Sequence, residues 1–145
     1  MEKANLFEEP QVIKSWKGFD GALNIEPLSQ GFIKYLDLSK EQDLGERFDW
    51  VMSVEVGEHI PHEYETVFLE NLVRHACKGL VLTWSSEIGK GHFHVNIHPR
   101  EYIIDRVVKM GLKHDPVAQE TLTETISLDY IKKGLMVFRV DPMKC

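Results

Sequence analysis

Two apolar runs separated by one amphipathic segment dominate the hydrophobic pattern of the chain. The first run is FDWVMSVE at residues 48–55, and the second is LVLTW at residues 80–84. Between them, apolar side chains recur at the spacing of one helical face, at Tyr64, Phe68 and Leu72. The pattern predicts two adjacent parallel strands, covered on both faces and joined by a right-handed helical crossover.

Proline and glycine residues mark the expected ends of the helices. Pro61 opens the first helix, and Gly79 is a plausible stop for it. Pro99 starts a second helix, REYIIDRVVKM, which ends at Gly111. An irregular or short helical piece and a final strand near residues 135–140 follow. The chain is therefore expected to alternate strands with helices.

Two shorter strands precede this part of the chain. Residues 11–19 roughly alternate between apolar and polar and end at a turn, Asp20-Gly21. The stretch GFIKYLDLS then predicts a strand that ends near Asp37. Strands alternating with helices favour an α/β fold with a Rossmann-like, mostly parallel sheet and flanking helices. The length suits one domain over residues 1–145.

Charge and cysteine content narrow the function classes. The chain has 145 residues and a formal net charge of -6, and its Lys and Arg residues are scattered. No phosphate-tracking basic stripe is visible, so nucleic-acid binding is not indicated. No apolar run has the roughly 18 residues of a membrane span, and no signal peptide is expected. Cys77 lies on the first helix pattern and Cys145 is the last residue, so we expect no disulfide framework and a reduced, cytoplasmic setting.

An acidic residue ends each of three early strands: Asp20, Asp37 and Glu55. In open α/β sheets, ligands bind beyond the carboxyl ends of the strands. Taken singly, Asp20 is equally well explained by a turn with Gly21, and Asp37 by a helix cap. Three acidic residues at equivalent places favour a ligand site.

Several segments resemble class I S-adenosylmethionine-dependent methyltransferases. FDWVMSVEVGEHIP is similar to the segment after the family's fourth strand, and GFDGALN and YLDLS resemble the ends of its second and third strands. GLVLTW, followed by GHFHVN and a helix, resembles the fifth strand and its substrate-side loop. The pieces occur in the family's order from about residue 12 to the C-terminus.

The resemblance implies roles for particular residues. Asp20 would bind the ribose hydroxyls of S-adenosylmethionine, Asp37 would face the adenine amino group, and Leu38 would lie beside the ring. Residues 53–55, including Ser53, would line the methionine end. The sequence does not identify the acceptor: a small hydroxylated molecule is compatible with the acidic composition, and protein or RNA acceptors stay open.

Glu55, Glu58 and His59 have the spacing i, i+3, i+4, which puts them on one side of a helical turn. Two carboxylates and an imidazole can hold a divalent cation, as in metal-dependent members of the family that carry a similar E-x-x-E-H segment. A fourth ligand would come from the loop after the second apolar run, which offers His92, His94 and His98, and His92 is included in the predicted set. The alternative is that Glu58 and His59 cap the next helix and line a pocket without metal.

The loop GHFH places His92 and His94 on the same side if it is extended. They are candidates for metal ligands, for a general base acting with Glu55 and His59 on the acceptor, or for parts of a mobile cover. His98 is also an N-cap candidate before Pro99. Five further positions have simple expectations: Trp50 and Trp84 in the core, and His62, His75 and His114 at the surface.

The chain departs from the family at its start. No G-x-G motif precedes residue 20, although the family uses such a loop to approach the cofactor. We therefore expect weak cofactor binding, and sheet edges that pair directly or borrow a strand from a homo-oligomer or another partner. Two other functions stay open. One is a non-catalytic interaction module, and the other is a metal-dependent hydrolase built on Glu55, His59, His92 and His94.

Overall fold

The structure, a computed structural model, describes residues 13–87 and 91–145. It consists of two compact units, Met1–Asp37 and Leu38–Cys145, and each is described by itself. The expected strand at residues 11–19 begins outside the described residues. A single domain over residues 1–145 stays a prediction.

The first unit is a small βαβ arrangement. Strand β1 (Gly18–Asp20) is followed by the short helix α1 (Ile25–Leu28) and by β2 (Ile33–Tyr35). The strands are parallel. The prediction of a strand over residues 11–19 is wrong for residues 13–17, because β2 offers only three residues for β1 to pair with.

The second unit contains a four-stranded sheet in the order β3-β4-β6-β5. The strands are β3 (Phe48–Ser53), β4 (Ala76–Leu82), β5 (Lys113–His114) and β6 (Met136–Arg139). Strands β3 and β4 are parallel neighbours, which confirms the prediction for the two apolar runs. Strand β6 is antiparallel to β4 and β5. The α/β class with a Rossmann-like sheet is confirmed.

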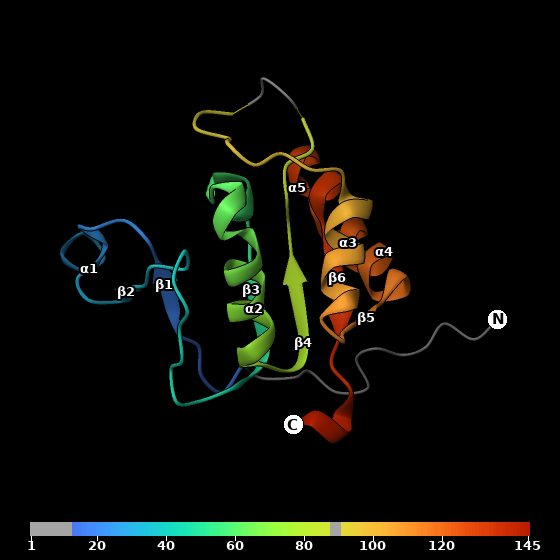
Figure 1. Ribbon diagram of the computed structural model, residues 1–145, viewed down its shortest axis with the longest axis horizontal. Helices are drawn as coiled ribbons and strands as arrows, with labels where there is room; N and C mark the ends of the chain where they lie inside the picture. Colours follow the sequence, from blue (N-terminus) through green and yellow to red (C-terminus); the bar gives the residue numbers. More distant parts are fainter. Residues whose placement is uncertain (1–12, 88–90) are drawn as a thin grey trace. The chain divides into compact units, whose positions relative to one another are not determined.

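Helices connect and cover these strands (Figure 1). The longer ones are α2 (Glu65–His75), α3 (Arg100–Lys109) and α4 (Pro116–Thr125), and α5 (Asp129–Gly134) precedes β6. Three short 3-10 turns are η1 (Gly57–His59), η2 (His62–Tyr64) and η3 (Pro142–Lys144). No helix of the described segments is both long and apolar enough to cross a membrane.

One hydrophobic core lies between helices α2 and α3 and one face of the sheet. Leu80 and Leu82 of β4 point to this face, and Phe138 of β6 lies opposite Leu80. Phe68 of α2 and Ile103 of α3 pack against them, and all five side chains are fully buried. Burial of each such side chain stabilises the fold by about 1.5–3 kcal/mol, so this face holds the two helices in place.

The other face of β3 is open, so the prediction that this strand is covered on both faces is wrong. Met52 is 72% exposed and Trp50 is 42% exposed, and Trp50 is therefore not a core residue. The Trp50 ring lies over Gly79 of β4, where a Cβ atom would collide with it. The guanidinium of Arg139 covers the ring at 4.8 Å. Trp84, by contrast, is in the core as predicted, with 1% exposure.

Helix α2 ends earlier than its apolar pattern predicts. The helix stops at His75, and β4 starts at Ala76, which lies opposite Phe48 of β3. Cys77 is therefore in a strand, and it forms a disulfide with Cys145, with 5.2 Å between their Cα atoms. The two cysteines were expected to make no disulfide framework, whereas the fold brings the C-terminal residue beside β4, where it pairs with Cys77.

His75 is buried, which corrects the prediction of a surface position. It is 7% exposed. Its Nδ1 lies 2.7 Å from the carbonyl oxygen of Asn71, and its Nε2 lies 3.0 Å from the backbone nitrogen of Leu44. These two contacts fix the neutral tautomer with the proton on Nδ1, because a backbone N–H can only donate to Nε2. His75 thus ties α2 to the segment before β3.

Candidate functional site

The carboxyl ends of β3 and β4 are tied together by Glu55 and Thr83. Glu55 has a φ of +54°, in the left-handed region that few side chains adopt. Its backbone N–H donates to Thr83 Oγ1 at 2.7 Å, and the Thr83 hydroxyl donates to Glu55 Oε1 at 2.8 Å. Backbone strain of this kind persists where surrounding contacts impose it, and it concentrates at functional sites.

Glu58 is a fully buried carboxylic acid. Within the described part of the chain, neither of its oxygens has a partner in good hydrogen-bond geometry, although the Glu55 side chain is near enough to interact with it. Its position follows from Gly57, where a Cβ atom would collide with the Trp84 ring, so turn η1 packs directly on the core. Burial, together with the nearby negative charge of Glu55, raises the pKa of Glu58 to about 7.

Two imidazoles lie beside Glu58. The rings of His59 and His94 meet edge to face with centroids 4.8 Å apart. One nitrogen of each ring and one Glu58 oxygen all lie within 4.8 Å of one another, a set that could hold a metal ion. His94 Nδ1 is buried and has no hydrogen-bond partner among the described residues. Gly91 makes room for this ring, since a Cβ atom there would collide with it.

The structure brings His94, and not His92, to this group. Phe93 has a φ of +62°, so residues 92–94 do not adopt the extended geometry from which both rings were expected to point the same way. His92 is exposed. The loop is instead held by the carbonyl oxygen of Glu58, which accepts from the backbone nitrogens of Val95 and Asn96 at 2.9 and 3.0 Å.

A second cluster surrounds Glu65 at the start of α2. Glu65 is 1% exposed. Its oxygens accept hydrogen bonds from Asn96 Nδ2 and from the Tyr102 hydroxyl, each at 2.9 Å. His98 Nε2 and His62 Nδ1 lie 3.0 and 3.4 Å from Oε2. Burial by itself raises the pKa of Glu65, but these hydrogen bonds and the histidines lower it overall.

Glu65 is not among the site residues that the sequence predicted. The His62 side chain is exposed as predicted, but it also belongs to this cluster. The N-cap of α3 is Pro99, so His98 does not have the predicted capping role. The sequence feature that could have predicted this cluster is the i, i+3 spacing of His62 and Glu65, which places both residues on one side of the helix start.

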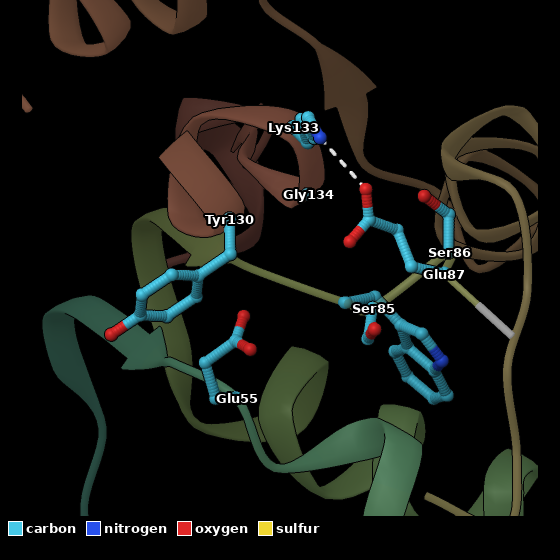
Figure 2. A pocket seen from close by; sticks show the side chains of 8 residues that line it. Glu55, Ser85, Ser86, Glu87, Tyr130, Lys133 and Gly134 are labelled. Atoms are coloured by element: carbon cyan, nitrogen blue, oxygen red, sulfur yellow. Dashed lines mark hydrogen bonds and ion pairs between the residues drawn. The ribbon is translucent and has the colours of Figure 1, made fainter. Parts of the chain in front are cut away.

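A small hollow opens beside Glu55 (Figure 2). The Glu55 carboxylate and the Tyr130 ring border it, and the Lys133 ammonium forms an ion pair with Glu87 Oε1 at 2.7 Å. The complete lining is Glu55, Trp84, Ser85, Ser86, Glu87, Tyr130, Lys133 and Gly134. The hollow has room for little more than a water molecule, so it marks a shallow surface beside Glu55.

Two residues predicted to bind the cofactor, Leu38 and Ser53, belong to the second unit. Leu38 is the first residue of that unit, and Ser53 is the last residue of β3. Ser53 is 6% exposed, and its hydroxyl has no hydrogen-bond partner among residues 13–87 and 91–145. Leu38 is half-buried against the core, and its carbonyl oxygen accepts from Asn71 Nδ2 at 3.2 Å. Asn71 is a positioning residue that the sequence analysis missed.

The two candidates of the first unit follow its parallel strands. Asp20 is the last residue of β1 and is exposed, and its Oδ1 accepts from the backbone nitrogen of Ala22 at 2.8 Å. This hydrogen bond closes the turn that the Asp20-Gly21 pair predicted. Asp37 comes two residues after β2 and is half-buried. Their roles in cofactor binding stay predictions.

The sequence matches no protein-family model and no curated protein. Solved structures, however, share its fold. Magnesium protoporphyrin IX methyltransferase (ChlM) from Synechocystis PCC 6803, solved with bound SAH, aligns with a TM-score of 0.52 at 16% identity over 80% of this chain. The chain has the fold of class I S-adenosylmethionine-dependent methyltransferases.

Two further methyltransferases align similarly. The N-methyltransferase NodS from Bradyrhizobium japonicum WM9 gives a TM-score of 0.55 at 14% identity over 84% of this chain. The 1,6-didemethyltoxoflavin-N1-methyltransferase from Burkholderia thailandensis gives 0.52 at 13% identity over 85%. The chain spans 55% of the ChlM chain, 71% of the NodS chain and 60% of the third.

Proposed function

We propose that this chain is an S-adenosylmethionine-dependent methyltransferase domain that acts on a small-molecule acceptor. One observation carries the proposal. Ser53 is the last residue of β3, and Glu58 lies in the turn that follows it. The Ser53 hydroxyl and the Glu58 carboxyl group are both buried and lack partners in good hydrogen-bond geometry among the described residues. Buried polar atoms without partners are rare in folded proteins, and a bound ligand would satisfy them.

In each unit, taken by itself, the residues predicted to bind the cofactor suit the part of it that they would hold. The exposed Asp20 carboxylate can accept hydrogen bonds from ribose hydroxyls, because only its Oδ1 is used in the turn with Ala22. Asp37 would bind the adenine amino group, with Leu38 beside the ring. Ser53 would donate its hydroxyl to the methionine end. Bound S-adenosylmethionine would supply a methyl group already activated by its sulfonium.

Because the methyl group is already activated, the residues of the chain would have to align the acceptor, exclude water and take up a proton. Glu55 and Tyr130 border the hollow, and we propose that they contact an acceptor bound at the surface above it. His59 and His94 are the proposed bases, because their rings meet beside Glu58. A Glu58 carboxyl that is protonated near neutral pH would not repel the Glu55 carboxylate. This proposal needs no metal ion at Glu58.

The names of the aligned structures support a small acceptor, since two of them act on magnesium protoporphyrin IX and on 1,6-didemethyltoxoflavin. The N-terminal residues of this chain carry no glycine-rich G-x-G loop before residue 20. We therefore expect the isolated chain to bind the cofactor weakly.

Isothermal titration calorimetry with S-adenosylhomocysteine tests the proposal. The full chain should bind at one site, with a dissociation constant weaker than micromolar. Micromolar or tighter binding would support the cofactor site and show that the missing loop matters less than expected. A folded chain that releases no heat and shows no ligand-dependent melting shift at millimolar ligand would contradict the proposal and favour a non-catalytic interaction module.

A further inference from the structure

We propose that His62, Glu65 and His98 form a zinc-binding site that is separate from the methyl-transfer site and independent of it. The three residues come from turn η2, the first turn of α2 and the loop before α3. One nitrogen of each histidine and one Glu65 oxygen all lie within 4.8 Å of one another. Two histidines and a glutamate are an established ligand set for Zn²⁺.

The separations between the donor atoms fit one shared ion. His98 Nε2 lies 3.0 Å from Glu65 Oε2, and His62 Nδ1 lies 3.4 Å from the same oxygen. Two ligands on a tetrahedron with bonds of about 2.0–2.1 Å are about 3.3–3.4 Å apart. The two separations from the carboxylate oxygen are therefore close to those of ligands that share one zinc ion, and the two histidine nitrogens lie within 4.8 Å of each other.

The direction of the His98 ring argues against a plain hydrogen bond. Although His98 Nε2 is only 3.0 Å from Glu65 Oε2, this buried nitrogen makes no hydrogen bond among the described residues. The two atoms are therefore close without having the geometry of a hydrogen bond. Ligands of a common ion have this arrangement, because their lone pairs point to a third position and not to one another.

Neighbouring side chains hold the ligands as a metal site requires. Asn96 Nδ2 donates to Glu65 Oε2 and the Tyr102 hydroxyl donates to Oε1. The Tyr102 ring also stacks on His98, with centroids 3.9 Å apart and an angle of 18° between the planes. Hydrogen bonds to ligating carboxylates and fixed imidazole orientations are typical of metal centres.

The charge and exposure of the cluster define what the site can do. Arg106 Nε lies 3.4 Å from Glu65 Oε1, the oxygen that is not shared with the histidines. The His62 side chain is 68% exposed, so a fourth position would be open to water. A bound ion would join α2 to the loop that carries His94.

Zinc binding by the full chain, purified without a histidine tag and treated with a chelator, tests this site. Zinc is titrated against a competing chromophoric chelator, and the melting temperature is recorded with and without zinc. The wild type should bind one zinc ion at this site and melt at a higher temperature with it. His62→Ala should weaken that binding at least tenfold with an unchanged circular dichroism spectrum, since the side chain is largely exposed.

Two control variants make the result specific. His92→Ala removes another exposed histidine and should leave zinc affinity unchanged. His59→Ala removes a histidine of the Glu58 group and should leave the His62-dependent binding intact. No zinc binding by the wild type, equal affinity in His62→Ala, or binding lost only in His59→Ala would each overturn the proposal. None of these results depends on S-adenosylhomocysteine binding, so the two proposals fail separately.

Discussion

The indole Nε1 of Trp84 donates a 2.7 Å hydrogen bond to the carbonyl oxygen of Asn96. Trp84 follows β4 and is 1% exposed, whereas Asn96 belongs to the loop that carries His94. Asn96 also donates to Glu65 through its side chain and to the Glu58 carbonyl through its backbone. These contacts place the loop, and with it His94, at the carboxyl end of the sheet.

Trp84→Phe should therefore destabilise the fold and loosen this loop. The loss of the buried hydrogen bond leaves the Asn96 carbonyl without its donor, which costs about 1–3 kcal/mol, and the smaller ring packs less well on Gly57. Urea unfolding monitored by circular dichroism measures the change. Trp50→Phe is the matched control and should cost less than about 1 kcal/mol, because Trp50 is 42% exposed. Equal losses in the two variants would contradict the role given to Trp84.

Glu58 should make stability fall as the pH rises from about 4.5 to about 7. Its pKa is raised from 4.5 to about 7 in the folded protein. Between these values the folded state holds a proton that the unfolded state has lost, so raising the pH favours unfolding. The full difference corresponds to roughly 3 kcal/mol, since one pKa unit is about 1.4 kcal/mol.

Glu58→Gln isolates this contribution, because glutamine has a similar shape and does not titrate. Relative to the wild type, the variant should gain stability steadily between pH 4.5 and pH 7 and keep that gain at pH 8. Chemical unfolding at a series of pH values gives the difference curve. A difference that does not vary with pH would show that Glu58 titrates normally in the folded protein.

Asn71→Leu should destabilise the segment that contains Leu38. The Asn71 amide donates to the carbonyl oxygens of Leu38 and Lys40 and accepts from the backbone nitrogen of Gln42. Leucine has a similar size but can make none of these bonds, so we expect a loss of about 2–4 kcal/mol in unfolding free energy. Glu70→Leu, at an exposed position of the same helix, should change stability by less than about 0.5 kcal/mol. A small effect of Asn71→Leu would mean that water replaces these contacts.

The disulfide between Cys77 and Cys145 closes a loop with a sequence separation of 68 residues. Cross-linking a loop of this length restricts the unfolded chain and should stabilise the fold by about 2–4 kcal/mol. Cys145→Ser should lower the melting temperature of the oxidised protein accordingly. Dithiothreitol should lower the melting temperature of the wild type to that of the variant and leave the variant unchanged. A wild type that does not respond to the reductant would contradict this contribution.

Asp20→Ala should weaken S-adenosylhomocysteine binding if the proposed cofactor role is correct. The loss of an acceptor for the ribose hydroxyls should cost about 1–3 kcal/mol of binding free energy, measured by calorimetry. Asp49→Ala is the control, because Asp49 is an exposed acidic residue that pairs only with Lys78 at the surface in the described contacts. An equal loss in both variants would point to a general effect of charge and not to a ribose contact.

Local patterns predicted the main elements because each depends on periodicity over a few residues. The two apolar runs form the parallel pair β3 and β4, and the prolines and glycines marked α3 closely. The topology of a parallel pair also placed the loops after both strands at one edge of the sheet. Glu58 and His94 meet there for that reason.

Other features depend on contacts between residues that are distant in the sequence, and no local pattern reveals them. A helical pattern continued to Gly79, but pairing with Phe48 and packing under the Trp50 ring made this stretch a strand. Burial of His75 likewise depends on a hydrogen bond from Leu44, 31 residues away. The apolar character of Trp50 could not show that its face of β3 is open.

The sequence and the tertiary structure also determined different features of the residues at the carboxyl edge of the sheet. The sequence by itself determined that carboxylates and histidines follow the two central strands, because residue types and strand order are properties of the chain. Only the tertiary structure decided that Glu58 is buried without a partner among the described residues, that Phe93 turns His94 inward, and that His98 reaches Glu65. Burial, backbone φ and side-chain distance are set by the packed neighbours of a residue, and these come from other segments of the chain.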